Sequence, residues 1–260
     1  MRQYLLDGSF HGEKNLTLTG KENQYLVKVL RLKVGDQILG RDRKGKTWNL
    51  RLERIEKNSC TLSATATEEG EAVVSIDSLP SYGGPYPRLF LYQCLCKGKK
   101  NELIVRQATE IGVEQITLVQ SKFCVRDFSN KKESASDRLE GQVKEAIQQS
   151  GSPIPTRLDD QILSIEELPQ HWQNKGPFIF FHQSERGLSQ SLPKLVATIP
   201  SGTPVGILIG SEGGLSDEEC LFLEEAGFLP ALLNTNILRA ETAATYALAV
   251  VQTLMTETEK

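Results

Sequence analysis

A segment rich in proline and glycine divides this chain into two parts with different patterns. Residues 78–87 hold three prolines and two glycines. Proline lacks a backbone donor and both residues interrupt regular structure, so neither a helix nor a central strand is expected to run through the segment. The sequence therefore predicts two domains, residues 1–77 and 88–260, joined by a linker at 78–87. A chain of 260 residues is long enough to bury a sizeable core in this arrangement.

The first part has the pattern of a small β-rich domain. Strand patterns occupy residues 37–40, 47–52 and 59–65, and turn residues precede the first two. Residues 21–32 have helical spacing instead, with apolar side chains at Tyr25, Leu26, Val29 and Leu30. Several short strands in so small a piece predict a compact β-barrel.

The second part alternates between strand and helix patterns. Apolar strands are predicted at 89–95, 115–119, 178–181, 205–209 and 228–233. Helices are predicted at 101–111, 136–150, 216–226 and 241–255. Gly112 is a stop signal for the first helix, and Ser216 with Glu219 forms a capping box that opens the third. This alternation predicts an α/β domain with a mostly parallel sheet covered on both faces.

The composition is that of an ordinary globular protein, with 39% hydrophobic and 24% charged residues. No apolar run approaches the ~20 residues of a membrane span, and the first residues lack the apolar core of a signal peptide. The five cysteines are few and odd in number, which fits a reducing cytoplasm better than a disulfide framework.

Positive charge is concentrated at the start of the chain. Residues 1–60 hold 13 lysines and arginines against 7 acidic residues, while the remainder holds 17 against 26. A basic piece attached to an acidic remainder is typical of a nucleic-acid-binding domain, but it is equally typical of a solvated basic surface. Charge alone leaves both interpretations open.

Common catalytic signatures are missing from the sequence. The three histidines have no metal-ligand spacing, and G-x-S-x-G, Walker A and G-x-G-x-x-G motifs are absent. Cys94 and Cys96 are predicted to share one face of a strand as small core residues, so we expect no metal. Hydrolase, kinase and classical dinucleotide-binding functions lose most of their support.

A glycine-rich loop follows the apolar strand predicted at 205–209. Residues 210–216 read Gly-Ser-Glu-Gly-Gly-Leu-Ser, and a capped helix follows. Glycines let the backbone turn sharply and approach a ligand, and parallel sheets bind ligands beyond the carboxyl ends of their strands. Glu212 is the only charge in this glycine loop. The alternative is a plain strand-to-helix turn, which needs one glycine more naturally than three.

A second loop, residues 233–239, also leaves a predicted strand and enters a predicted helix. It reads Leu-Asn-Thr-Asn-Ile-Leu-Arg. Its polar residues would lie beside the glycine loop if the two strands are neighbours. Arg239 just before a helix start is opposed by the helix dipole, so its place has no obvious structural reason. Glu241 and Thr242 are compatible with simple helix-start chemistry, which does not exclude a second role.

The two segments together, Ile-Gly-x-Glu-Gly-Gly-Leu-Ser and Ile-Leu-Arg-Ala-Glu-Thr-Ala, resemble a bacterial methyltransferase family. That family methylates N3 of a uridine in small-subunit (16S) ribosomal RNA and belongs to the SPOUT class of knotted, S-adenosylmethionine-dependent enzymes. The resemblance spans the chain. Val29-Leu30-Arg31-Leu32 with Gly35-Asp36 is similar to the family's PUA-like domain, and residues 97–100, 108–113 and 145–151 to its catalytic domain.

The resemblance implies a fold and a set of site residues. The fold is a SPOUT-type domain with a trefoil knot, a parallel sheet and an N-terminal PUA-like β-barrel, in a homodimer. The implied cofactor is S-adenosylmethionine, without a metal. Its candidate binding residues are Ile209, Gly210, Glu212, Gly213, Gly214, Leu233, Ile237, Leu238, Glu241, Thr242 and Ala243.

Catalytic and RNA-binding candidates follow from the same resemblance. Arg239 is the candidate for stabilising charge that develops on the uracil oxygens, and Glu212 is a weaker candidate for a base or a cofactor anchor. The candidate RNA contacts are Lys28, Arg31, Lys97, Lys99 and Lys100. The implied partner is small-subunit ribosomal RNA.

The sequence also departs from the family's usual residues, mostly by losing positive charge. The departures are Lys28, Gln107, Ser152, Ser211, Asn234 and Asn236. The lost charges are of the kind that contacts RNA phosphate or the target base. Two alternatives therefore stay open: a SPOUT enzyme that acts on another RNA such as tRNA, and an inactive RNA-binding factor in ribosome assembly.

Overall fold

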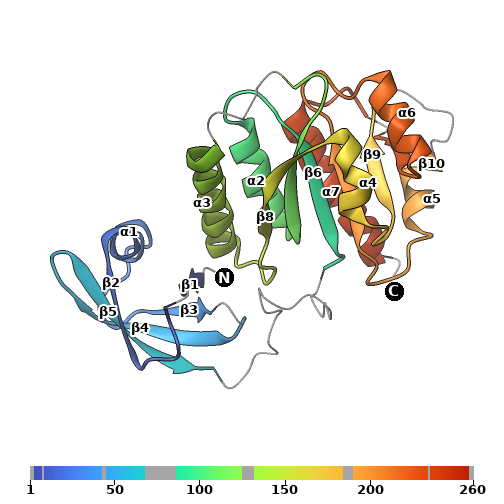
Figure 1. Ribbon diagram of the computed structural model, residues 1–260. Coiled ribbons are helices and arrows are strands. Elements are labelled where there is room, and N and C mark those ends of the chain that lie inside the picture. The colour runs from blue at the N-terminus through green and yellow to red at the C-terminus, as the bar shows by residue number, and fades with distance from the viewer. Residues whose placement is uncertain are drawn as a thin grey trace. The chain divides into compact units, whose positions relative to one another are not determined.

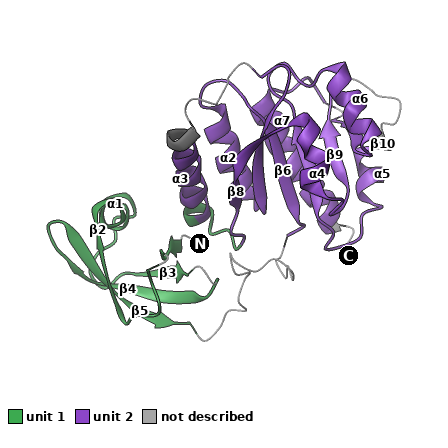
Figure 2. Ribbon diagram, viewed as in Figure 1, with its two compact units in different colours: residues 1–83, 148–153 green, residues 84–147, 154–260 purple. Residues whose placement is uncertain are grey.

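The structure is a computed structural model of the chain (Figure 1). It describes residues 3–7, 9–42, 45–67, 86–124, 132–183, 190–233 and 235–257. The chain forms two compact units (Figure 2): unit 1 comprises residues 1–83 and 148–153, and unit 2 comprises residues 84–147 and 154–260. Most of the predicted linker, residues 78–85, lies outside the described residues.

Unit 1 is built on one five-stranded sheet with the strand order β1-β3-β4-β5-β2. Its strands are β1 Gln3–Leu5, β2 Asn15–Thr19, β3 Gln37–Arg41, β4 Thr47–Ile55 and β5 Ser59–Ala66. β1 pairs with β3 in parallel and the other pairs are antiparallel. The three predicted strands are confirmed, and their inward residues, among them Leu50, Leu52 and Leu62, form the core of the unit. β1 and β2 were not predicted.

The short segment 148–153 belongs to unit 1 through specific hydrogen bonds. Gln3 Nε2 donates to the Ser152 carbonyl at 3.0 Å, and Arg41 Nη1 donates to the Pro153 carbonyl at 2.9 Å. The unit is therefore assembled from two separate pieces of sequence.

The segment predicted as one helix at 21–32 forms two short helices of different types. α1 covers Gly20–Gln24 and the π-helix η1 covers Tyr25–Val29. Leu26 is fully buried, but Val29 is 61% exposed. The prediction that Val29 shares the buried face is wrong, because a π-turn holds more residues than an α-turn and rotates the next side chain outward. Arg31 follows with φ of 57°, a left-handed conformation uncommon for residues other than glycine.

Unit 2 is an α/β domain around a seven-stranded sheet with the order β10-β12-β9-β11-β6-β7-β8, and every pairing in it is parallel. This confirms the predicted fold class. The strands are β6 Leu89–Cys94, β7 Gln115–Gln120, β8 Arg157–Ser164, β9 Phe178–Phe181, β10 Gln190–Ser191, β11 Val205–Ile209 and β12 Leu229–Leu232. The helices are α2 Lys100–Ile111, η2 Ile165–Glu167, α4 Leu168–Trp172, α5 Leu192–Val196, α6 Asp217–Glu225, α7 Ala240–Glu257 and most of α3 Lys132–Ser150, whose residues from 148 onward belong to unit 1.

Both faces of this sheet are buried, which explains the continuous apolar runs of its central strands. Phe90, Tyr92 and Cys94 of β6 join an aromatic core with Trp172 and Phe228 on one face. α7 packs against β6 and β11 and also against α2. All six residues of β6 are buried as a result.

Local stop and start signals were predicted at the right places. Gly112 ends α2 with φ of 93°, and the Ser216–Glu219 capping box opens α6. Cys94 ends its strand, however, so Cys96 lies in the following loop rather than on the same strand face; both thiols are buried. Burial raises the pKa of the Cys96 thiol to about 12. Within the described ranges, no helix is long and apolar enough to cross a membrane.

Candidate functional site

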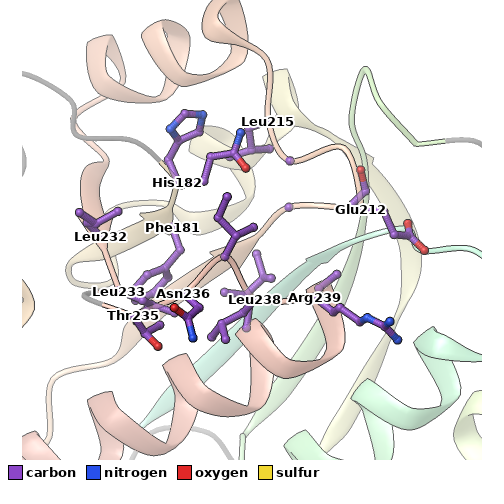
Figure 3. Close-up of a pocket in the computed structure, with 18 of the residues that line it drawn as sticks. Phe181, His182, Glu212, Leu215, Leu232, Leu233, Thr235, Asn236, Leu238 and Arg239 are labelled. Atoms are coloured by element: carbon purple, nitrogen blue, oxygen red, sulfur yellow. The ribbon is translucent and has the colours of Figure 1, made fainter.

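One pocket lies at the carboxyl ends of four adjacent strands, β6, β11, β9 and β12 (Figure 3). Its volume is about 700 Å³, which is within the range of pockets that enclose a small molecule. The lining comes from the segments that follow each strand: Lys100, residues 181–183, 209–212 and 214–215, and residues 232–233, 235–240 and 243. Ligands of parallel α/β sheets bind at this edge.

The glycine loop is a tight turn that leaves its backbone open to the pocket. Gly214 donates its N–H to the Ser211 carbonyl at 2.9 Å and has φ of 72°. A Cβ on Gly210 would lie 3.0 Å from the Gly214 α-carbon, so a larger residue there would push the turn open. Gly210 and Gly214 are therefore both required by the geometry of the turn, one more glycine than a plain turn needs.

The second loop supplies apolar side chains and one cation. Leu233 and Leu238 are half-buried, and Figure 3 shows both beside Asn236 and Thr235. Ile237 is 83% exposed although it lines the pocket, which places it at the rim. Arg239 is exposed, and its carbonyl accepts the first helical hydrogen bond of α7 from Ala243 at 2.8 Å.

A small charge network ties the two loops to α2. Lys100 Nζ lies 2.9 Å from Glu212 Oε1 and 3.6 Å from Glu241 Oε2. The Lys97 N–H also donates to Glu212 Oε1, at 3.0 Å. Partial burial alone would raise the pKa of Glu212, but the hydrogen bonds from Lys100 and from backbone N–H groups outweigh it and lower that pKa. The same pair raises the pKa of Lys100.

Arg239 takes no part in this network. Among the residues that the structure describes, its guanidinium has no hydrogen bond or ion pair, while Glu212 is engaged with Lys100. Figure 3 shows Arg239 and Glu212 on the same side of the pocket. The cation is therefore available to a bound substrate.

Two buried polar atoms at the site have no hydrogen bond within the described ranges. One is Ser211 Oγ in the glycine loop, and the other is Glu241 Oε2 in the first turn of α7. Buried polar groups are almost always paired in folded proteins. A polar ligand in the pocket would supply the missing partner for Ser211.

The structure places the predicted site residues in three groups. The following predicted residues line the pocket: Lys100, Ile209, Gly210, Glu212, Gly214, Leu233, Ile237, Leu238, Arg239 and Ala243. Gly213, Glu241, Thr242, Lys97 and Lys99 lie next to lining residues in the same loops and helix starts. Lys28 and Arg31 belong to unit 1.

Sequence reasoning missed the contribution of β9. Phe181, His182 and Gln183 line the pocket at the end of this strand. The strand itself was predicted, and the rule that ligands bind beyond the carboxyl ends of parallel strands would have indicated these residues too.

Two family models match the chain. The model of the RNA methyltransferase domain matches residues 84–252, and the model of the RNA methyltransferase PUA domain matches residues 18–64. The first match covers the whole pocket, and the second falls within unit 1.

Named proteins match over most of their length. The ribosomal RNA small subunit methyltransferase E of Bacillus subtilis is 28% identical over 241 residues, covering 90% of this chain and 88% of the relative. The ribosomal RNA small subunit methyltransferase E 2 of Borreliella burgdorferi is 29% identical over 259 residues and 98% of both chains. A crystal structure of the Neisseria gonorrhoeae methyltransferase E bound to S-adenosyl methionine has a TM-score of 0.79 at 23% identity, with 98% of both chains covered.

Proposed function

This chain belongs to the RNA methyltransferase family, and on that premise we propose that it methylates N3 of a uridine in small-subunit (16S) ribosomal RNA with S-adenosylmethionine as methyl donor. The observation that carries the proposal is the pocket between the glycine loop and the second loop, inside the region that the family model covers. Relatives named small subunit methyltransferase E, matched over nearly their whole length, support the choice of RNA.

The residues of the pocket fit the proposed cofactor. Leu233 and Leu238 offer apolar contacts for the adenine, the glycine loop offers backbone groups at close range, and Ser211 Oγ has no hydrogen-bond partner among the described residues. When bound, the sulfonium group supplies an activated methyl group. The other proposed contacts are Ile209, Gly210, Glu212, Gly213, Gly214, Ile237, Glu241, Thr242 and Ala243.

The proposed catalytic residue is Arg239. Uracil N3 loses its proton to solvent water before or during attack, and negative charge then spreads over the ring oxygens. The Arg239 guanidinium, which has no ion pair among the described residues, stabilises that charge most in the transition state. Glu212 is better suited to anchor the site than to take the proton, because its pKa is lowered and its carboxylate is held by Lys100.

RNA binding is proposed for exposed cations in both units. Lys28 and Arg31 are exposed in unit 1, where the PUA model matches. Lys97 and Lys99 are exposed in the loop between β6 and α2, next to the pocket. Lys100 is half-buried in its ion pairs, so we assign it to the site rather than to the RNA.

The proposal includes the knotted chain path and the homodimer that the resemblance implies. The knot rests on the resemblance alone, through the motifs at residues 209–216 and 237–243. The dimer is supported by two exposed large side chains, Ile237 at the rim of the pocket, which is 83% exposed, and Tyr246 of α7, which is 44% exposed. Sedimentation of the purified chain measures the dimer directly.

The deciding experiment is mass spectrometry of nucleosides from 16S ribosomal RNA of cells with and without the gene. Loss of N3-methyluridine on deletion, and its return with the intact gene, is the expected result. Unchanged ribosomal RNA would overturn the proposal. Loss of a modification from tRNA would then favour a tRNA enzyme, and cofactor and RNA binding without any methyl transfer would favour an inactive assembly factor.

A further inference from the structure

An exposed aromatic side chain lies against the glycine loop. Phe123 follows β7 and is 43% exposed. A Cβ added to Gly213 would lie only 2.7 Å from the Cβ of Phe123, so the Phe123 side chain packs directly against the α-carbon of that glycine. Gly213 stands between Glu212 and Gly214, which both line the pocket. Phe123 therefore presents an apolar ring beside the pocket.

The turn that carries Phe123 is anchored on both sides. The Lys122 N–H donates to Glu219 Oε1 at 2.7 Å, and the Cys124 N–H donates to the Ser121 carbonyl at 3.0 Å. Ser121 is 4% exposed, and Cys124 packs against the aromatic core of unit 2. These contacts fix the backbone on either side of Phe123.

Glu219 links this turn to the glycine loop. Its second oxygen, Oε2, accepts from the N–H of Ser216, the last residue of the glycine loop, at 2.7 Å. One buried carboxylate thus holds the Phe123 turn and the end of the glycine loop together. An exposed aromatic ring on so firmly held a support loses little conformational entropy when it binds a ligand.

Basic residues flank the same place. The Lys97 N–H is bonded to Glu212 Oε1, so the loop of Lys97 and Lys99 adjoins the glycine loop on the side of Glu212. Both lysines are exposed. Exposed cations beside an exposed aromatic ring are the combination that binds single-stranded nucleic acid, with phosphates near the cations and a base on the ring.

We infer that Phe123 stacks on a base of a single-stranded nucleotide in the RNA substrate, next to the pocket, and so positions the RNA for methyl transfer. The inference rests on the proposed function, because it takes RNA as the substrate of this site. Stacking on an aromatic face is tolerant of base identity, so Phe123 contributes affinity and position more than sequence specificity.

The test compares Phe123→Ala, Phe123→Leu and Phe123→Trp with wild-type protein in RNA titrations at one stated salt concentration. The probe is a 16S ribosomal RNA fragment that the wild type methylates. We expect the Ala and Leu variants to bind it about 5- to 100-fold more weakly and the Trp variant to bind it at wild-type strength or better. S-adenosylmethionine affinity is expected to stay unchanged in all three. Leu221→Ala is the matched control, because Leu221 of α6 is an apolar side chain that is 52% exposed.

Two further readouts separate stacking from a purely structural role. Leucine retains apolar bulk against Gly213 but lacks the aromatic face, so wild-type RNA affinity in Phe123→Leu would overturn the inference. In the Trp variant, RNA is expected to quench the new indole fluorescence, and RNA carrying 5-iodouridine is expected to crosslink at position 123. Absence of both signals while RNA binds would also overturn it.

Other failures have distinct signatures. Wild-type protein that binds cofactor but no ribosomal RNA would overturn the proposed function and this inference together. Wild-type RNA binding with an unaffected Phe123→Ala variant would overturn only the inference. A variant that becomes monomeric in sedimentation, with RNA affinity per chain unchanged, would show that a second copy of the chain covers Phe123 instead.

Discussion

Lys100 and Glu212 form an ion pair, 2.9 Å from Nζ to Oε1, that joins the first turn of α2 to the glycine loop. The same ammonium lies 3.6 Å from Glu241 at the start of α7, directly after the second loop. Both segments proposed to hold the cofactor therefore share one cation, which lies more than 100 residues before either of them in the sequence. The arrangement makes Lys100 a positioning residue.

Replacing Lys100 with methionine is expected to weaken S-adenosylmethionine binding by a factor of about 1.4 to 5, because a partly exposed ion pair contributes ~0.2–1 kcal/mol. Calorimetry at low salt measures the change, which should shrink as salt is added. Lys99→Met is the control, since Lys99 is exposed and has no ion pair among the described residues. Equal affinity in the two variants would contradict the positioning role.

Acid is expected to remove the contribution of the Glu212 carboxylate to stability. Its pKa in the folded protein is lowered from the ordinary value of 4.5. A lowered pKa means that the stabilisation is complete above pH 4.5 and is lost as pH falls through the folded value. The difference in unfolding free energy between wild type and Glu212→Gln should therefore be constant near neutrality and shrink below pH 4.5. A difference that grows in acid would refute this assignment.

Arg239→Ala is expected to lower the single-turnover rate of methyl transfer about 10²–10³-fold while S-adenosylmethionine affinity changes little. The guanidinium has no partner among the described residues, so its removal should not loosen the loop. Arg239→Lys should restore only part of the rate, because lysine lacks the planar fork of donors. An alanine variant that reacts at the wild-type rate would show that Arg239 has no catalytic role. An alanine variant that is monomeric in sedimentation would show that Arg239 stabilises the dimer instead.

Replacing Arg31 with glycine removes the positive charge of this residue without adding strain to the backbone. With φ of 57°, arginine is in a conformation that favours glycine. Relief of that strain offsets the extra flexibility of glycine in the unfolded chain, so stability should change by less than about 1 kcal/mol. RNA affinity should fall, and the slope of its logarithm against the logarithm of salt concentration should decrease by about one. Unchanged RNA binding would make Arg31 a structural residue.

Gly214→Ala is expected to damage the site as well as the fold. Gly214 has φ of 72° and closes the glycine loop, while Gly202 has φ of 74° outside the pocket, and neither has atoms within 4 Å of an added Cβ. Both alanine variants should unfold more easily, by roughly 1–2 kcal/mol. Only Gly214→Ala should also weaken S-adenosylmethionine binding, as measured by calorimetry. Equal cofactor affinities would show that the turn is not part of the site.

Elements with a local signature were predicted from the sequence, and elements held by distant contacts were not. The capping box of α6 and the glycine after α2 act over a few residues, so their patterns were sufficient. β8 was missed because Asp159, Asp160 and Gln161 interrupt its apolar run. Its Asp159 is accommodated by tertiary partners, among them His171 at 3.0 Å and Gln115 at 3.0 Å.

The same division applies to the site. The glycine loop and the second loop were predicted because each directly leaves a strand with a strong apolar pattern. The pairing of Lys100 with Glu212 could not be predicted, since 112 residues separate them. Only the strand order β11-β6 makes the segment after β6, which leads to Lys100, a neighbour of the glycine loop after β11. Phe123 carried no signal in the sequence, because its place on Gly213 depends on the whole sheet.

The two-piece construction of unit 1 has a consequence for how the chain folds as it is made. Gln3 and Arg41 find their carbonyl partners on Ser152 and Pro153. At synthesis rates of roughly 5–20 residues per second, those partners leave the ribosome many seconds after β1 does. The N-terminal unit therefore cannot complete its hydrogen bonds until the first strands and helices of unit 2 have emerged, so the two units mature as interleaved rather than successive events.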